Sequence, residues 1–104
     1  MVTRRTPHHD LADIQAKFSD VDMLEITRKA TQDAQALGYS LQDVVEAVQD
    51  LEPGDFVKSE PAHNPPVPGI WHDSYNMPWD GRWLYLKFAG ATLIDVTLTS
   101  FKER

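Results

Sequence analysis

The sequence predicts an α+β fold in which three N-terminal helices pack on one face of a mainly antiparallel β-sheet. The spacing of apolar residues changes from about 3.6 to 2 near Pro53-Gly54, so helices should precede this point and strands should follow it. Asp80-Gly81 lies between two extended runs and is a strong hairpin signal, because glycine readily adopts the positive φ of a tight reversal. The 104 residues are expected to form one domain, residues 1–104, around one modest core.

The first helix is predicted to begin at Thr6-Pro7 and to end near Phe18. Threonine is a good N-cap, and proline suits the first helical position, where its missing N–H is not needed. The short apolar run at residues 23–26 follows this helix and is predicted to be a minor edge strand.

The second and third helices have clear start and stop signals. The second should begin after Thr27 and end just before Gly38, since glycine is favoured immediately after a helix. The third should begin at Ser40, which forms a capping-box pattern with Asp43, and Pro53-Gly54 should end it.

The C-terminal half predicts an antiparallel meander. Strands are expected at residues 55–59, 70–75, 82–88 and 92–101. Residues 61–69 contain four prolines and are predicted to form an exposed, irregular loop. Gly90 should mark the turn before the last strand.

Side chains alternate between the two faces of a strand, so the faces of this sheet can be assigned. The core face should carry the following apolar residues: Leu84, Leu86, Phe88, Ile94, Val96 and Leu98. Tyr85 and Lys87 should point the other way, and His72 should lie opposite to its neighbour Trp71. Strict alternation would turn Lys102 inward, so we expect a bulge or the strand end near residues 99–100 to turn it outward.

Several classes of protein are excluded by what the chain lacks. It has no cysteine, and therefore no disulfide framework, thiolate metal site or thiol nucleophile. No apolar run reaches the roughly 18 residues of a membrane span, and the N-terminal arginines are not followed by the apolar segment of a signal peptide. No spacing typical of a metal site or a phosphate-binding loop is present. We therefore expect a cytoplasmic protein with no metal, no cofactor and no membrane contact.

The net charge of −6 argues against a nucleic-acid partner, whose phosphates attract positive charge. However, the charge is unevenly distributed. Residues 1–54 carry five Lys and Arg against ten Asp and Glu, a balance of −5, whereas residues 55–104 carry five against six, a balance of −1. The half that forms the predicted sheet is nearly neutral, so an RNA partner stays possible.

A polar, mostly basic set of side chains is predicted on or near the open face of the sheet: Lys58, His72, Arg82, Tyr85, Lys87 and Lys102. This set suits metal-free cleavage of an RNA phosphodiester. A base takes the proton of the ribose 2′-OH, an acid protonates the leaving 5′-oxygen, and cations stabilise the charge on the phosphate. Histidine titrates near neutral pH, so His72 could act as either acid or base.

Aromatic rings near this face could stack on unpaired bases. Trp71 is predicted to lie in the core, whereas Trp79, at the hairpin turn, is predicted to be exposed. We therefore expect Trp79, Arg82 and Lys87 to bind RNA.

Five short segments follow one another in the chain: RTPH at 5–8, DFVKS at 55–59, IWHDSY at 70–75, LYLK at 84–87 and SFKER at 100–104. In this order and spacing they resemble the MqsR-type toxins (motility quorum-sensing regulator family), which belong to the RelE-like group of mRNA interferases. The resemblance covers most of the chain and implies a RelE-like fold.

In the family that this chain resembles, a lysine, a glutamine, a tyrosine and a second lysine form the catalytic group. The matching positions here are Lys58, His72, Tyr85 and Lys102. His72 is a departure, because an ionisable side chain stands where the family usually has glutamine. The proline-rich insertion at residues 65–68, a longer hairpin around Gly90 and the acidic composition also depart from the family.

The resemblance implies a toxin of a type II toxin–antitoxin system. Such a toxin is a metal-independent endoribonuclease that cleaves single-stranded mRNA by 2′-OH attack and so inhibits translation and growth. Its cognate antitoxin, MqsA-like or another DNA-binding antitoxin, would hold it inactive.

A second interpretation is a catalytically silent, toxin-like protein that binds only an antitoxin or another protein. The acidity of the chain and the exchange at His72 favour it, and Lys58 and Lys102 could then be ordinary solvated lysines. The presence of both lysines together with Tyr85 favours the enzyme, because a binding scaffold does not require this combination.

Overall fold

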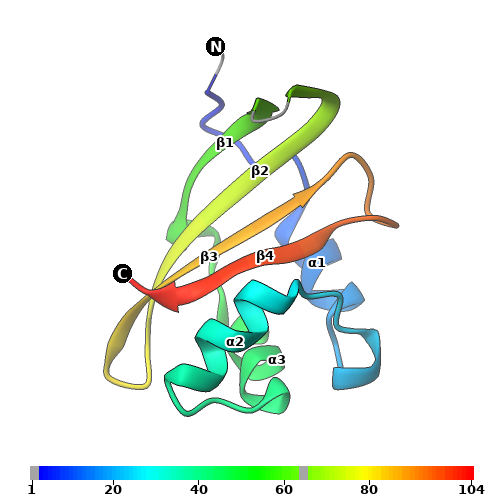
Figure 1. Cartoon of the computed structure of the whole chain (residues 1–104). Coiled ribbons are helices and arrows are strands. Elements are labelled where there is room, and N and C mark those ends of the chain that lie inside the picture. The colour runs from blue at the N-terminus through cyan, green and yellow to red at the C-terminus, as the bar shows by residue number, and fades with distance from the viewer. Residues whose placement is uncertain (1–2, 64–65) are drawn as a thin grey trace.

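The computed structural model describes residues 3–63 and 66–104. Within these residues three α-helices come first and four antiparallel strands follow, which confirms the predicted α+β fold. The helices gather along one side of the sheet, and the N-terminal segment runs beside the first strand (Figure 1). The other face of the sheet is therefore left open.

Helix α1 (Leu11–Lys17) begins later than predicted. Its N-cap is Asp10, whose side chain accepts a hydrogen bond from the N–H of Ala12 at 3.3 Å. The predicted start at Thr6-Pro7 is wrong. The residues just before α1 donate their N–H groups to the carboxylate of Asp73 in the sheet, a charged acceptor that a helical turn would not offer.

Helices α2 (Arg28–Ala36) and α3 (Leu41–Asp50) have the predicted boundaries. Thr27 caps the first of them, and Gly38 follows it with a φ of 92°. The capping box that begins at Ser40 has both of its hydrogen bonds. These ends depend on contacts within a few residues, so the local sequence was sufficient to predict them.

The predicted strand at residues 23–26 is reduced to a single bridge. Val21–Met23 forms a 3₁₀ helix, η1, and Ile26 makes an isolated parallel bridge to Leu98. Backbone hydrogen bonds of 2.9 and 3.1 Å join Leu98 to the residues on either side of Ile26. This segment covers part of the outer edge of the sheet.

The sheet has the order β1-β2-β3-β4, with every neighbouring pair antiparallel. A short 3₁₀ helix, η2 (Pro53–Asp55), leads into it. The strands are β1 (Phe56–His63), β2 (Pro66–Trp79), β3 (Arg82–Gly90) and β4 (Thr97–Glu103). Asp80 and Gly81 join β2 to β3 with φ values of 52° and 73°, the positive pair of a type I′ hairpin, so the predicted turn is confirmed.

The prediction of an irregular loop at residues 61–69 is wrong for most of that range, because β1 and β2 both extend into it. Pro61 pairs with Trp71 and His63 with Pro66, and the register shifts between Pro61 and His63. Proline has no N–H to donate, but β1 is an edge strand and β2 begins at Pro66, which are positions where a sheet tolerates proline. Residues 64–65 of the predicted loop lie outside the described residues.

The last strand begins later than predicted, because residues 92–95 form a turn. The carboxylate of Asp95 accepts hydrogen bonds from the N–H of Thr92 at 2.8 Å and from its hydroxyl at 3.1 Å. Ile94, which was predicted to face the core, is 86% exposed, so that prediction is wrong. An aspartate that binds its own loop competes with strand pairing, although the β-branched sequence favours a strand.

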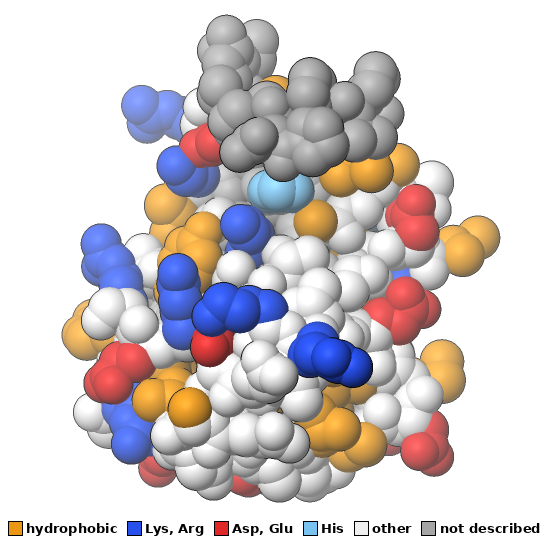
Figure 2. Space-filling model, viewed as in Figure 1, with side chains coloured by type: hydrophobic (Ala, Val, Ile, Leu, Met, Phe, Trp, Pro, Cys, Tyr) orange, Lys and Arg blue, Asp and Glu red, His pale blue; other side chains and the backbone are white. Residues whose placement is uncertain are grey.

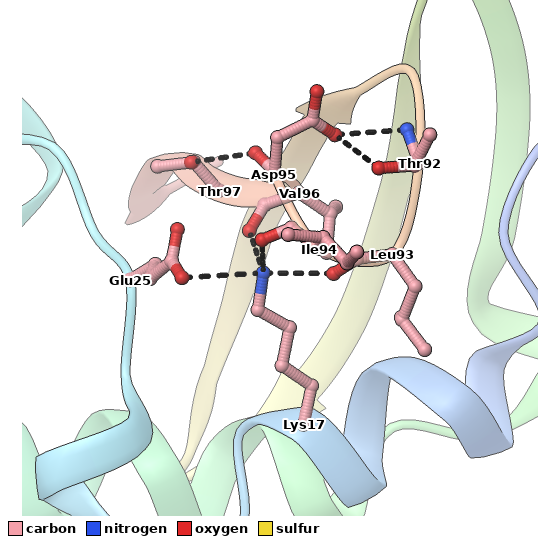
Figure 3. Close-up of polar contacts among 8 residues, drawn as sticks. All are labelled: Lys17, Glu25, Thr92, Leu93, Ile94, Asp95, Val96 and Thr97. Carbon is pink, nitrogen blue, oxygen red and sulfur yellow. Dashed lines mark hydrogen bonds and ion pairs between the residues drawn. The ribbon is translucent and has the colours of Figure 1, made fainter.

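Lys17 holds this turn against α1 (Figure 3). Its ammonium donates to the carbonyl oxygens of Leu93, Ile94 and Val96 at 2.8, 2.8 and 2.9 Å, and Glu25 lies 3.4 Å away. The ammonium thus gives three backbone carbonyl oxygens of this segment a hydrogen-bond donor.

The hydrophobic core lies between the helices and the inner face of the sheet. Its sheet side is made of alternate residues, and the buried positions include Tyr75, Met77, Leu84, Leu86, Phe88, Val96, Leu98 and Phe101. The predicted alternation of β3 is confirmed. Gly90 is buried at the end of β3, where the backbone of Val96 passes close by.

Replacing Gly90 with alanine should lower the free energy of unfolding by about 1–3 kcal/mol, the usual cost of overpacking. A Cβ atom at this position would lie 2.6 Å from the Cα of Val96, and backbone atoms cannot move aside cheaply. Urea denaturation of the variant measures the effect. Gly54→Ala is the matched control, since no atom lies within 4 Å of the added Cβ. Equal stability of the two variants would contradict the prediction.

Candidate active site

Three rows of side chains cross the open face of the sheet, and cross-strand pairing defines each row. The tyrosine row contains Asn76, Tyr85 and Lys102. The lysine row contains Lys58, Ser74, Lys87 and Ser100. The histidine row contains Glu60, His72 and Ala89. Figure 2 shows several Lys and Arg side chains close together over the sheet, with a histidine nearby.

The tyrosine row brings Tyr85 and Lys102 together on β3 and β4. The Tyr85 hydroxyl lies 3.0 Å from the hydroxyl of Ser74, which holds the phenol in place. The Lys102 ammonium lies 5.6 Å from the centre of the Tyr85 ring. The two side chains form one wall of a shallow hollow that Lys87 and Ser100 also line.

A bulge in β4 turns Lys102 toward this face. Lys87 pairs with Ser100 and the next residue, Phe88, pairs with Leu98, so Thr99 is the extra residue. Phe101 is consequently buried while Lys102 is exposed. The predicted bulge near residues 99–100 is confirmed.

The lysine row places Lys58 and Lys87 between the other two rows. The Lys58 ammonium contacts the carboxylate of Glu60, two residues further along β1. This contact raises the pKa of Lys58, so the amine is a stable positive charge at neutral pH rather than a base. Lys58 is therefore suited to stabilising a negative phosphate.

The histidine row contains a carboxylate that was not predicted as a site residue. Glu60 pairs directly with His72 across β1 and β2, and both side chains are half-buried. Alternation along β1 was the available signal, because Glu60 must share a face with Lys58, two residues before it. It was missed because the matched family segment ends at residue 59, and the length of β1 was underestimated.

Arg82 and Trp79 lie next to the Asp80-Gly81 turn of the β2–β3 hairpin, on the helix side of the sheet. The Arg82 guanidinium donates to the Tyr39 hydroxyl at 2.7 Å and to the Leu37 carbonyl at 3.2 Å. The indole N–H of Trp79 donates to Asp50 at 2.9 Å, and its ring packs against the core. Trp79 is half-buried, so its predicted exposure is wrong. The structure brings neither side chain to the rows on the open face, whereas Lys87 belongs to one of them.

Trp71 was predicted to lie in the core and is instead half-exposed beside the N-terminal segment. The Arg4 guanidinium lies 3.7 Å from the centre of its ring, and the His8 ring stacks on it at 5.9 Å. The N-terminal segment, rather than a helix, covers this side of the sheet. The hydrophobic pattern of the sequence did not predict this packing. The RTPH sequence of this segment therefore has a structural role.

Asp73 fastens the N-terminal segment to the sheet. Its fully buried carboxylate accepts hydrogen bonds from the backbone N–H groups of His8 at 3.0 Å and His9 at 2.9 Å, and from the Ser59 hydroxyl. Neighbouring residues of a strand point to opposite faces, so Asp73 supports the structure below the site while His72 lies on the open face.

Two further features of the described chain bear on function. Among residues 3–63 and 66–104, no three His, Asp or Glu side chains are grouped so that they could hold a metal ion. In the same residues, no helix is long and apolar enough to cross a membrane.

The fold and the site define a small α+β protein whose open sheet face carries lysine, tyrosine and histidine side chains. The family model of the motility quorum-sensing regulator, toxin of MqsA, matches residues 6–103. The chain therefore belongs to this toxin family, as its five segments predicted. No curated protein matches the chain. Membership of the family makes the chain a toxin of a toxin–antitoxin system with an antitoxin as its partner.

Proposed function

We propose that this toxin is an mRNA interferase, an endoribonuclease that cleaves single-stranded mRNA in the cytoplasm without a metal ion and so inhibits translation and growth. The observation that supports this proposal best is the gathering of Lys58, Tyr85 and Lys102 on one face, with His72 in the adjoining row. These positions match the family's catalytic group.

Each of the three rows has a different role in phosphodiester cleavage. Lys58 and Lys87, in the middle row, attract the scissile phosphate and stabilise the charge that builds up on it. Tyr85 and Lys102 supply donors on one side, and His72 supplies an acid or base on the other. The 2′-hydroxyl of the substrate is the nucleophile, because none of these side chains is an activated nucleophile.

Purified toxin should cleave a defined single-stranded RNA in the presence of EDTA and leave a 2′,3′-cyclic phosphate and a 5′-hydroxyl. DNA of the same sequence should remain intact, and so should RNA with a single 2′-deoxynucleotide at the mapped cleavage site, because each lacks the attacking hydroxyl. End-group analysis of the products measures the outcome. Loss of cleavage in EDTA, or cleavage at the deoxynucleotide, would refute the mechanism.

A catalytically silent toxin-like protein is the second candidate. The contact between Lys58 and Glu60 favours it, because the carboxylate neutralises a cation that an RNA phosphate would need. If the protein binds its antitoxin and leaves every tested RNA intact, the silent interpretation replaces the enzyme.

A further inference from the structure

Glu60 and His72 form one end of the site, and Tyr85 and Lys102 form the other. Side chains two residues apart on one face of a strand are separated by roughly 7 Å, so the two ends lie on either side of the lysine row. The following inference rests on the proposed ribonuclease activity: it adds Glu60 to the site and assigns the base and the acid to opposite ends.

Cleavage by an internal hydroxyl requires a base and an acid on opposite sides of the phosphorus, because the entering and leaving oxygens are roughly in line. A phosphate held at the lysine row satisfies this requirement. The histidine row then faces one oxygen and the tyrosine row faces the other.

We propose that His72 is the general base and that Glu60 is a positioning residue that orients the imidazole and stabilises its protonated form. The His72 imidazole takes the 2′-OH proton while the bond between the 2′-oxygen and phosphorus forms. The bond from phosphorus to the 5′-oxygen breaks, and the 5′-oxygen takes a proton from the Lys102 ammonium. The products are the cyclic phosphate and a 5′-hydroxyl, and the proton on His72 later returns to Lys102 through solvent.

The charges around His72 determine whether its protonated or its neutral form is favoured. Glu60 lies directly opposite on β1, at the close range of a cross-strand pair, and favours the imidazolium form. Ala89, opposite on β3, has no charge. Lys58 and Lys87 are diagonal neighbours on these two strands and favour the neutral imidazole, and the contact between Lys58 and Glu60 weakens the effect of both of those charges. Glu60 is the charged residue paired directly with His72, so its effect outweighs that of the diagonal lysines and makes His72 a stronger base.

Three variants test the inference: Glu60→Gln, His72→Gln and the double variant. A general base acts when it is neutral, so the cleavage rate of the wild type should rise with pH through the His72 titration. Glu60→Gln should move this rise to lower pH and reduce kcat about tenfold or more, with a smaller change in KM. His72→Gln should abolish the rise, and because the family usually has glutamine at this position, cleavage should persist at a rate that no longer changes with pH. In the His72→Gln background, Glu60→Gln should have little further effect, because the group through which it acts is missing.

The His72 titration, followed by NMR of the ring protons, gives a readout that does not depend on activity. Its midpoint should be lower in Glu60→Gln than in the wild type. Glu46→Gln, which removes an exposed carboxylate of α3, should change neither the midpoint nor the rate.

Two results would overturn the inference. The first is that Glu60→Gln cleaves RNA faster and binds it more tightly, by the same factor whether residue 72 is histidine or glutamine. Glu60 would then act only by pairing with Lys58 and weakening the attraction of that lysine for RNA. The second is an unchanged His72 midpoint. A wild type that leaves RNA intact would instead refute the proposed function, and the NMR titration would still decide whether Glu60 acts on His72.

Discussion

Replacing Lys58 or Lys102 with alanine should lower the rate of RNA cleavage by about 10²–10³-fold, the usual loss when a group that stabilises charge or donates a proton in the transition state is removed. Lys58 lies in the row that would hold the phosphate, and Lys102 lies beside Tyr85, where the leaving oxygen would depart. Both side chains are largely exposed and make no contribution to the core, so the folded structure should survive. Single-turnover cleavage of an end-labelled RNA measures the loss.

Lys29→Ala is the matched control. Lys29 is an exposed lysine on α2 that pairs with Asp33, four residues away and far from the open face. This variant carries the same change of net charge and should cleave RNA at the wild-type rate. Undiminished cleavage by both site variants would show that neither lysine takes part in catalysis. An equal loss in all three variants would show that the two lysines act only through the overall charge of the protein.

Replacing Asp73 with alanine should lower the free energy of unfolding by about 3 kcal/mol or more. The substitution removes a buried carboxylate that accepts hydrogen bonds from two backbone N–H groups and the Ser59 hydroxyl, and each unsatisfied buried donor costs about 1–3 kcal/mol. Water entering from the exposed side of the N-terminal segment would recover part of this loss. Urea denaturation measures the change.

Two related variants separate the contributions to this site. Asp73→Asn keeps one acceptor oxygen and should lose less stability than Asp73→Ala. Ser59→Ala removes one donor and leaves both backbone hydrogen bonds intact, so its loss should be the smallest of the three. If Asp73→Ala is as stable as Ser59→Ala, the N-terminal segment does not depend on this carboxylate.

The candidate site was predictable to the extent that it follows strand alternation. Tyr85 and Lys87 were assigned to the open face from the period of β3, and the structure places them there. Lys102 required a bulge, which could be expected because a strict alternation would have buried a charged side chain. Glu60 obeys the same alternation, but it lies beyond the point where prolines suggested that β1 had ended.

Local signals determined the boundaries of α2 and α3, the tight turn at Asp80-Gly81 and the core face of β3. Each depends on residues within a few positions of one another: a capping side chain, a glycine with positive φ, or a period of two. Such features form in nearly the same way whatever the rest of the chain does, so they can be read from the sequence itself.

Tertiary contacts decided the features that the sequence mispredicted. The start of α1 depends on Asp73, which is 65 residues from His8, and the turn around Ile94 is held by Lys17, which is 77 residues from Ile94. Trp79 donates a hydrogen bond to Asp50, and the Arg4 guanidinium lies over the ring of Trp71. A buried carboxylate or a fixed ammonium group can outweigh a local preference because it satisfies several backbone groups at once, and which groups it meets is known only after the sheet and helices have packed.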